Sequence, residues 1–348
     1  MNLNKITLPY GKNIGEGRAF LIAEIGSNHN QNLDLAFETI DAAIEAGADA
    51  VKFQSINVDE LYYSPTLETR KLHKKIDLDE SWHHLLAEYC DKKGIIFFSA
   101  PTYLKAVDLL EDVDVSLYKL ASAQIGTFPQ LVEKVIKTGK PVILSTGIVN
   151  LFELKNIIQL FKKFNNNQFV ILHCNSIYPT PFDKVHLPVM KMISKEFNCL
   201  VGFSDHTPGD TAPIAAVAMG AKVIEKHFAL SRKLPVPDAP FSLEPNEFKV
   251  MVDKIRQVEE MLVVNNRNNI HEEEKSFKDG IKSRLVSKKI LEAGAFVNID
   301  DFDFMRHPSG VDAVNLNELI AQKARYKRNI SSGIVVNDDD LTFEFNYD

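Results

Sequence analysis

Eight short apolar runs, each ending in polar or charged residues, are spaced between residues 20 and 227 of this chain. The runs are FLIAE (20–24), AVKFQ (50–54), IIFFS (95–99), LYKLAS (117–122), VILS (142–145), FVILH (169–173), LVGFS (200–204) and VIEKH (223–227). Helical patterns separate most of them, at 32–45, 81–93, 104–111, 128–138, 151–164, 187–196 and 211–219. This alternation predicts an α/β fold with a TIM (β/α)8 barrel, rather than an open doubly wound sheet, which usually has fewer parallel strands.

The length of the chain suits one barrel and a small second domain, because 348 residues that are 45% hydrophobic can bury a large core. Residues 1–19 are expected to form a short lead-in, such as a hairpin over the bottom of the barrel. A long amphipathic helix over 245–262 closes the predicted barrel domain, 1–263. The polar segment 264–283 predicts a linker, and the short alternating runs of 284–348 predict a small β-rich domain.

Charge and composition disfavour several classes of partner. The net charge is −7 and no basic block occurs, which disfavours nucleic acid, whereas local lysines could still bind an anionic small molecule. No apolar run approaches the roughly 20 residues that span a bilayer, and the first residues lack the apolar core of a signal peptide. The three cysteines form no CxxC pair, which is typical of free thiols in a cytoplasmic protein.

The polar residues at the ends of the runs would meet at one rim, since the carboxyl ends of barrel strands form the active-site floor. They are Glu24, Lys52, Gln54, Ser99, Lys119, Ser122, Ser145, His173, Ser204, His206, Glu225 and His227. Two lysines at one barrel mouth repel each other unless an anion lies between them, and a phosphate or carboxylate could be that anion. Two alternatives remain open: each lysine pairs with a neighbouring carboxylate, or one lysine forms a Schiff base.

His206 and His227 follow neighbouring strands and lie within reach of one cation. Neutral imidazole suits Mn²⁺, Fe²⁺, Co²⁺ or Zn²⁺ better than Mg²⁺, and two protein ligands leave positions open for water and substrate. We expect Mn²⁺, with Mg²⁺ or Co²⁺ as alternatives. The competing hypothesis is that both histidines are hydrogen-bonded to barrel carboxylates such as Asp205 and Glu225.

Three further groups could contact a polyol substrate. Glu24 precedes the loop that contains Asn28, Asp238 lies in a loop after the last strand, and Tyr178 follows the sixth run. Each also has a structural explanation, as a loop anchor, a turn cap or a turn aromatic.

The motifs AEIGSNHN, AVKFQS, YKLAS, LSTGI, HCNSIYPTP, VGFSDHT and VIEKHF, in this order, resemble the sialic acid synthase family. Its members make nonulosonic acids from phosphoenolpyruvate and an N-acylated hexose. The resemblance covers residues 20–262 and resumes in RLVSKKI and FMRHPSGV, which resemble the family's C-terminal antifreeze-like (SAF) domain, here 284–348. The segment DAPFSLEPNEFKVMV is more similar to pseudaminic acid synthases than to N-acetylneuraminate synthases, and a ManNAc-like sugar or a 2,4-diacetamido-trideoxyhexose would be the acceptor.

This resemblance implies a role for each matching residue. The phosphoenolpyruvate-binding positions are Lys52, Lys119, Ser122, Ser145 and Ser204. The metal ligands are His206 and His227. The sugar-contacting positions are Glu24, Gln54, Asn28, Tyr178 and Asp238, together with Arg306, which the C-terminal domain would lend to the other subunit of a domain-swapped homodimer.

The chain departs from the family pattern at Gln124, where the family has a glutamate that is a candidate base. Glu24, Glu225 or a metal-bound hydroxide would then act as the base, and Gln124 stays among the expected catalytic residues. Ala100 replaces a usual hydroxyl residue, and the segment 55–80 is short. A Schiff-base aldolase and a degenerate, non-catalytic sugar-binding homologue remain as alternative functions.

Overall fold

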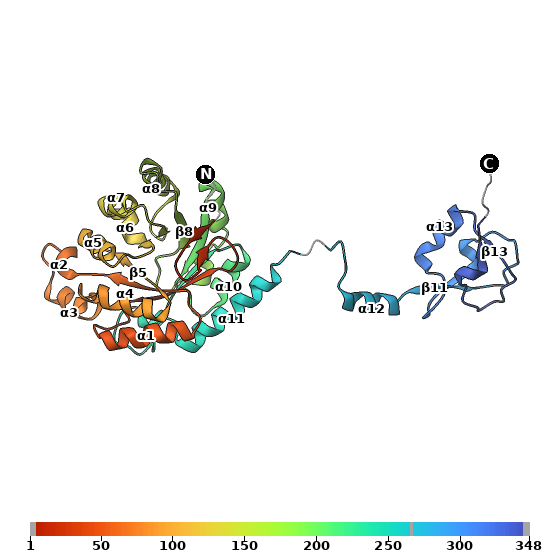
Figure 1. Ribbon diagram of the computed structural model, residues 1–348, viewed down its shortest axis with the longest axis horizontal. Coiled ribbons are helices and arrows are strands. Elements are labelled where there is room, and N and C mark those ends of the chain that lie inside the picture. The colour runs from red at the N-terminus through yellow and green to blue at the C-terminus, as the bar shows by residue number, and fades with distance from the viewer. Residues whose placement is uncertain (1–4, 265–266, 344–348) are drawn as a thin grey trace. The chain divides into compact units, whose positions relative to one another are not determined.

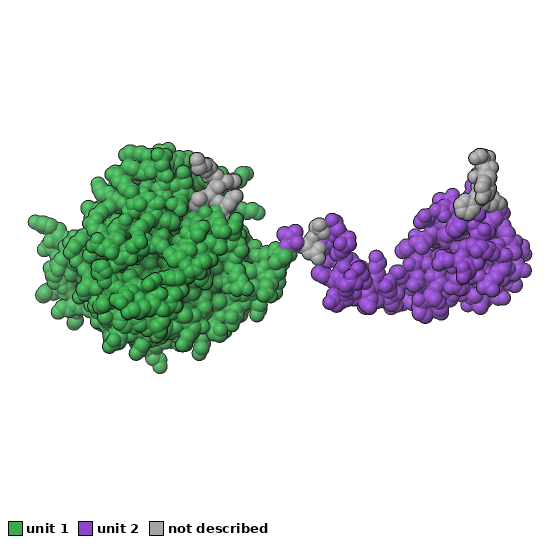
Figure 2. Space-filling model, viewed as in Figure 1, with its two compact units in different colours: residues 1–263 green, residues 264–348 purple. Residues whose placement is uncertain are grey.

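The computed structural model describes residues 5–264 and 267–343, which form two compact units, 1–263 and 264–348 (Figure 1 and Figure 2). Parts of the predicted lead-in, linker and C-terminal domain, namely residues 1–4, 265–266 and 344–348, lie outside the described residues. Each unit has a hydrophobic core of its own.

The first unit contains a sheet of eight parallel strands, in the order β5-β4-β3-β10-β9-β8-β7-β6 along its described part. The strands are β3 (Phe20–Gly26), β4 (Ala50–Ser55), β5 (Ile96–Pro101), β6 (Tyr118–Leu120), β7 (Val142–Ser145), β8 (Phe169–Cys174), β9 (Leu200–Asp205) and β10 (Val223–His227). The two end strands, β5 and β6, also contact each other, so the sheet is nearly closed. The predicted TIM-like barrel is confirmed, and every predicted run overlaps one of these strands.

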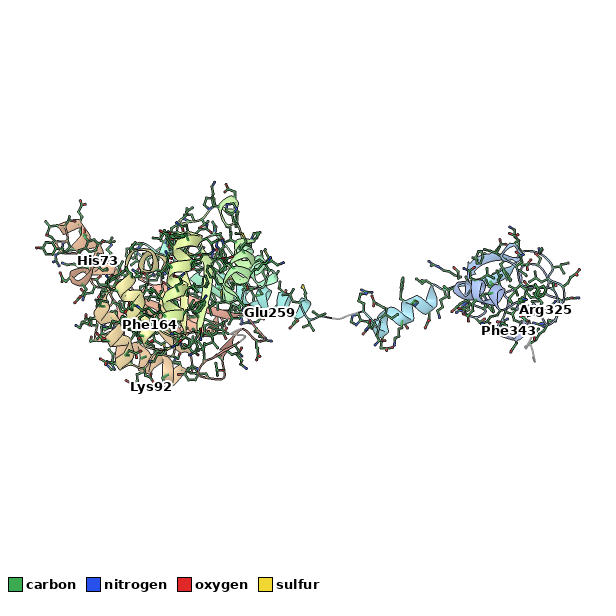
Figure 3. All side chains as sticks on the ribbon, turned by 90° about the horizontal axis from the view of Figure 1, so that it is seen from above. His73, Lys92, Phe164, Glu259, Arg325 and Phe343 are labelled. Atoms are coloured by element: carbon green, nitrogen blue, oxygen red, sulfur yellow. The ribbon has the colours of Figure 1, made fainter. Side chains whose placement is uncertain are left out.

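Helices alternate with the strands and cover the outside of the sheet (Figure 1). The predicted helices correspond to α1 (Leu33–Glu45), α4 (Trp82–Lys93), α5 (Leu104–Asp112), α7 (Pro129–Lys137), α8 (Leu151–Lys163), α9 (Val189–Phe197), α10 (Thr211–Ala218) and α11 (Pro245–Met261). Glu259 of α11, labelled in Figure 3, accepts a hydrogen bond from the N–H of Ala19 at 2.5 Å and fixes the helix to the start of β3. None of the described helices is both long and apolar enough to cross a bilayer.

Three helices of the first unit were not predicted: α2 (Val58–Leu61), α3 (Leu67–Ile76) and α6 (Ser122–Thr127). The helices α2 and α3 lie in the 55–80 segment and bury little apolar surface, since only Val58 and His73 of the two are buried. The helix α6 begins inside the run that predicted a strand over 117–122. That strand ends at Leu120, and Ser122 is instead the first residue of a helix.

The lower interior of the barrel is closed by apolar side chains. The two-stranded hairpin β1 (Ile6–Thr7) and β2 (Asn13–Ile14) contributes Ile6, Leu8 and Ile14 to a core with Phe20 and Val223, the first residues of β3 and β10. The predicted hairpin over the barrel bottom is confirmed. The space for chemistry therefore lies at the other, carboxyl end of the strands.

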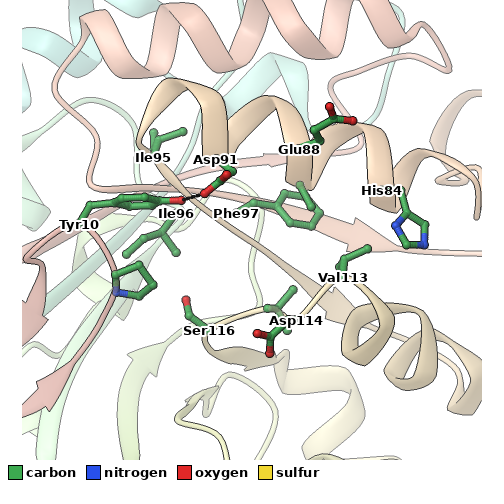
Figure 4. Close-up of a pocket in the computed structure, with 13 residues that line it drawn as sticks. Tyr10, His84, Glu88, Asp91, Ile95, Ile96, Phe97, Val113, Asp114 and Ser116 are labelled. Atoms are coloured by element: carbon green, nitrogen blue, oxygen red, sulfur yellow. Dashed lines mark hydrogen bonds between the residues drawn. The ribbon is translucent and has the colours of Figure 1, made fainter.

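A cavity of about 400 Å³ lies beside this hairpin, at the amino-terminal ends of β5 and β6 (Figure 4). It is lined by Tyr10 and by residues of α4, and the Tyr10 hydroxyl donates to Oδ1 of Asp91 at 2.7 Å. None of the predicted site residues lines it.

The second unit begins with α12 (Glu272–Gly280), which lies in the segment predicted as a linker. Its helix is favoured by a capping box between His271 and Glu274 and by an ion pair from Lys275 to Glu272 at 2.6 Å. The remaining elements are β11 (Ser283–Ser287) paired with β12 (Phe302–Arg306), α13 (Leu316–Ala321), and β13 (Arg325–Tyr326) paired with β14 (Leu341–Thr342). The guanidinium carbon of Arg325 (Figure 3) lies 3.6 Å from the centre of the Phe296 ring.

Short 3-10 turns complete the two units. They are η1 (Phe182–Lys184), η2 (Ala239–Phe241), η3 (Ile299–Asp301), η4 (Ala313–Asn315) and η5 (Asp338–Asp340).

Candidate active site

Strand alternation brings most of the predicted side chains into one space. Phe20 and Ile22 of β3 lie in the barrel interior, so Glu24, two residues further on, faces the interior one layer higher. Other polar residues also lie two or four positions after an interior apolar residue of their strand, so they face the interior as well. They are Lys52 and Gln54 (β4), Lys119 (β6), Ser145 (β7), Ser204 (β9), and Glu225 and His227 (β10). The sequence pattern therefore positions a polar layer directly above an apolar one.

Two predicted rim residues face the helices instead. Ser99 follows the interior Phe98 and lies 2.8 Å from the hydroxyl of Ser55, and Nε2 of His173 donates to the carbonyl of Val185 at 2.5 Å. The prediction that all polar strand ends share one mouth was wrong for this pair, because alternation turns them outward.

Two lysines and two glutamates form the centre of the polar layer. The Lys52 ammonium lies 2.7 Å from Oε2 of Glu24 and 3.6 Å from Oε2 of Glu225, and the Lys119 ammonium lies 3.5 Å from Oε1 of Glu225. Ser204 donates to Glu225 Oε1 at 2.9 Å, and Gln54 donates to Glu24 at 2.6 Å. Lys52 therefore has a close carboxylate partner, whereas Lys119 is farther from its partner than the 2.7–2.9 Å typical of a charge-assisted hydrogen bond.

The two glutamates differ in charge state. Burial raises the pKa of Glu24 to about 7, although Lys52 opposes this shift. Burial would also raise the pKa of Glu225, but Lys119 and Lys52 together outweigh it and hold this pKa at about 2. Burial lowers the pKa of Lys119, and Glu225 only partly offsets the effect. Glu225 is thus a fixed negative charge, and Glu24 can exchange a proton near neutral pH.

Hydroxyl and amide groups lie at or just after the carboxyl ends of β6 and β7. The hydroxyl of Ser122 accepts a hydrogen bond from the N–H of Gly147 at 2.8 Å. Ser145 Oγ and Gln124 Oε1 are buried and make no hydrogen bond within the described residues. Unpaired buried polar atoms of this kind are costly, and they indicate a site that binds a polar ligand.

The two predicted metal ligands lie together, with ring centroids 5.3 Å apart. Nδ1 of His206 is 2.8 Å from the carbonyl oxygen of Asn175, which can only accept, so Nδ1 donates and Nε2 retains its lone pair. Nδ1 of His227 is buried without a hydrogen bond and lies 4.0 Å from Oδ2 of Asp238. The alternative that barrel carboxylates hydrogen-bond both rings is not what the geometry shows.

These histidines have the form that binds a metal. Burial lowers the pKa of His206 to about 4 and that of His227 to about 3, so both rings are neutral at physiological pH. Within the described part of the chain, no cluster of three or more His, Cys, Asp or Glu side chains could hold a metal ion. A cation here would have two imidazole ligands and open positions, which fits the chemistry of Mn²⁺ or Co²⁺.

The predicted sugar-contacting residues border the histidines. The Tyr178 ring lies 4.1 Å from that of His206, and with Asp238 it lines a cavity of about 720 Å³. Asn28 also anchors a loop, because its amide nitrogen donates to the carbonyl of Phe228 and to Ser242, and its own carbonyl oxygen has no hydrogen bond among the described residues. Arg306 is exposed at the end of β12 in the other unit.

Sequence reasoning missed two features beside the site. The ring of Phe241 lies 4.9 Å from that of His227, and a loop residue of this kind leaves no periodic signal. Lys226 and Asp205, which are next to the two histidines in the chain, form a buried ion pair with an N–O distance of 2.5 Å on the helix-facing side of the sheet. The signal for this pair was present, since a lysine at an outward strand position would face apolar helices unless it is paired.

Comparisons with known proteins show the family and the fold of this chain. The NeuB family model matches residues 39–267. The N,N'-diacetyllegionaminic acid synthase of Campylobacter jejuni is 34% identical over 88% of this chain and 96% of that protein, and a pseudaminic acid synthase of the same species is 35% identical over 88% and 92%. The crystal structure of the N-acetylneuraminic acid (sialic acid) synthetase from Leptospira borgpetersenii, in complex with citrate, superposes with a TM-score of 0.73 and 32% identity, covering 79% of this chain and 95% of that one.

Proposed function

This chain belongs to the NeuB family, and on that premise we propose that it is a nonulosonic acid synthase that condenses phosphoenolpyruvate with an N-acylated hexose and releases phosphate. Carbon 3 of phosphoenolpyruvate would form a bond to the sugar aldehyde carbon. Water would add at carbon 2, and the bond from carbon 2 to the phosphate oxygen would break. The enzyme would be a transferase that forms a carbon–carbon bond.

The observation that carries this proposal is the unequal pairing of the two buried lysines. Lys119 is 3.5 Å from its carboxylate, and Ser145 beside it has a buried hydroxyl without a hydrogen bond among the described residues. A phosphate or carboxylate group placed between them would supply the charge and the acceptor that both lack. Lys52, Ser122 and Ser204 complete the proposed phosphoenolpyruvate site.

Glu24 and Glu225 have separate roles in this proposal. Glu24, whose pKa lies at about 7, would accept the proton from the attacking water. Glu225 stays ionised and holds both lysines toward the substrate. Gln124 carries no ionisable group, so its amide would orient the water or the substrate by hydrogen bonding.

A divalent cation, Mn²⁺ or alternatively Mg²⁺ or Co²⁺, would be held by His206 and His227 and would polarise the aldehyde oxygen of the open-chain sugar. Tyr178, Asp238, Asn28 and Gln54 are proposed to orient the sugar beside the two rings.

The second unit is proposed to be an antifreeze-like (SAF) domain that places Arg306 over the active site of a second chain in a domain-swapped homodimer. Its described residues support a small folded domain, with a core that includes Leu285, Phe302 and Tyr326. Arg306 is exposed, and its guanidinium could donate hydrogen bonds to the N-acyl oxygen of a sugar or to an anion.

Phosphate release tests the proposed reaction. The protein is incubated with phosphoenolpyruvate, Mn²⁺ and a panel of N-acylated hexoses that includes 2,4-diacetamido-trideoxyhexoses and ManNAc. The expected result is sugar-dependent release of phosphate, with one acceptor preferred. Binding of a sugar without release by any acceptor would support the degenerate, non-catalytic homologue instead.

A second candidate, a Schiff-base aldolase on the same barrel, is favoured by one observation: burial lowers the pKa of Lys119. A lysine with a lowered pKa has more of the neutral amine that forms an imine. Borohydride in the presence of substrate would trap that imine on Lys119, and the reaction would need no metal.

A further inference from the structure

Strands β9 and β10 carry a buried ion pair on the side that faces the helices. Asp205 and Lys226 are direct neighbours in the register, and their side chains are 0% and 1% exposed. The residues that precede them on this outward side, Phe203 and Ile224, belong to the apolar core between strands and helices. Two charges in such surroundings have a large desolvation cost.

This pair is hydrogen-bonded to Thr207, the residue that directly follows the predicted metal ligand His206, and Asp205 directly precedes that ligand. Lys226 Nζ donates to Asp205 Oδ2 at 2.5 Å and also to the carbonyl of Thr207. Asp205 accepts from the N–H of Thr207 at 2.9 Å and from its hydroxyl at 3.1 Å. The turn that contains His206 is therefore tied to Lys226, and Lys226 directly precedes His227 in the chain.

Contacts on the inner side complete the support of His206. Its ring donates from Nδ1 to the carbonyl of Asn175, and its own carbonyl accepts from the N–H of Thr180 at 2.9 Å. The ring and the backbone of this residue are thus fixed by separate sets of bonds.

Stability alone does not account for the ion pair. Replacing a buried pair by apolar residues of similar size is often neutral or stabilising. By contrast, several directional hydrogen bonds to one turn fix the distance between that turn and the neighbouring strand β10, and apolar packing would define this distance less closely.

We infer that Asp205 and Lys226 are a positioning pair, which holds His206 and His227 at the separation that a shared divalent cation requires. This inference rests on the proposed function, because it assumes that the two histidines bind a metal. The pair would act through Thr207 and through the backbone of β9 and β10, not by contact with substrate.

The double variant Asp205→Leu/Lys226→Met tests the inference, since it removes both charges and leaves neither unpaired. Mn²⁺ binding to the metal-stripped, full-length protein is measured by the electron paramagnetic resonance signal of free Mn²⁺. The Kd for Mn²⁺ is expected to rise about 10–100-fold, as for the loss of other groups that orient metal ligands. The thermal midpoint should be retained. The KM for phosphoenolpyruvate should also be retained, because Lys52, Lys119 and the serines of the proposed phosphoenolpyruvate site are unchanged.

The double variant Ser55→Ala/His83→Leu is the matched control. It also removes a fully buried polar contact on the outside of a barrel strand, the 2.8 Å bond from Ser55 to Nε2 of His83, but neither residue is next to a proposed metal ligand in the chain. Its affinity for Mn²⁺ should stay within about twofold of the parent's, because distant sites act independently.

The outcomes separate the inference from the proposed function. If the parent has no Mn²⁺ site that His227→Ala removes, the proposed metal site fails and the inference fails with it. If the parent has that site and the Asp205→Leu/Lys226→Met protein binds Mn²⁺ equally well, the inference alone is overturned. If that protein does not fold, Thr207→Val, which removes only the hydroxyl bond to Asp205, decides: severalfold weaker binding supports the inference and unchanged binding overturns it.

Discussion

At the scale of single residues, Glu225 sets the charge of the candidate site. It lies 3.5 Å from the Lys119 ammonium and 3.6 Å from that of Lys52, and its pKa of about 2 keeps it ionised. Glu24, with its pKa raised to about 7, is partly protonated at neutral pH. The cluster of two lysines and two glutamates therefore has a deficit of negative charge, which an anionic substrate would correct.

The variant Lys119→Met should raise the KM for phosphoenolpyruvate by about 10- to 100-fold, because a hydrogen bond to a charged group is worth roughly 1.5–3 kcal/mol. Steady-state kinetics at saturating sugar measure the change. Lys92→Met, in an exposed ion pair with Glu88 on α4, is the control and should keep the parent's KM. An unchanged KM in Lys119→Met, or a borohydride-trapped adduct on Lys119, would contradict the proposed phosphoenolpyruvate site.

The variant His227→Ala should lose both activity and Mn²⁺ binding while the fold is retained. A site with two protein ligands cannot lose one and still hold the cation in place. Circular dichroism checks the fold, and titration with Mn²⁺ checks the site. Full activity in this variant, or in the metal-stripped parent, is the result that the proposed metal site does not allow.

At the scale of elements, the sequence predicted the strands closely and the irregular helices poorly. Runs such as VILS and VIEKH each follow a glycine-containing turn and are buried on both faces, so they stand out in the sequence. The helices α2, α3 and α12 are charged and bury few residues, so they carry no apolar stripe.

The candidate site could be located from the sequence, because parallel strands bring their carboxyl ends to one edge. The direction of each side chain needed the register as well, and this is why Ser99 and His173 were misplaced. Contacts made by loops, such as those of Asn28 and Phe241, depend on tertiary structure that no local pattern encodes.

The loop after β7 offers a prediction at this scale. A Cβ at Gly147 would lie 2.2 Å from Oγ of Ser176, 2.9 Å from Oγ of Ser122 and 3.0 Å from the Ser176 N. Gly147→Ala must therefore move the segments that follow β6 and β8, which contain Ser122 and Ser176. The variant should destabilise the fold by about 1–3 kcal/mol and reduce kcat/KM for phosphoenolpyruvate. Denaturant unfolding and kinetics measure the two effects.

Gly280→Ala is the control, because a Cβ there meets no atom within 4 Å. It should leave stability and kinetics close to those of the parent. Equal behaviour of the two alanine variants would show that the close approach at Gly147 does not shape the site.

At the scale of the whole molecule, the proposed homodimer places Arg306 of one chain in the site of the other. Mixing two inactive proteins, Arg306→Ala and Lys119→Ala, under conditions of subunit exchange should restore about a quarter of the parent's activity, since half of the dimers would carry one intact site of two. If each barrel is instead completed by its own C-terminal unit, every site keeps one lesion and the mixture stays inactive.

This chain is proposed to join phosphoenolpyruvate to a sugar with cleavage of the bond between carbon 2 and the phosphate oxygen. Phosphoenolpyruvate labelled with ¹⁸O at that bridging oxygen tests it most directly, with Mn²⁺, the preferred sugar and mass spectrometry of both products. We expect the released phosphate to carry the label and the organic product to have the mass of both substrates plus water minus phosphoric acid. Label retained in the organic product, or no product of that mass with any N-acylated hexose, would contradict it.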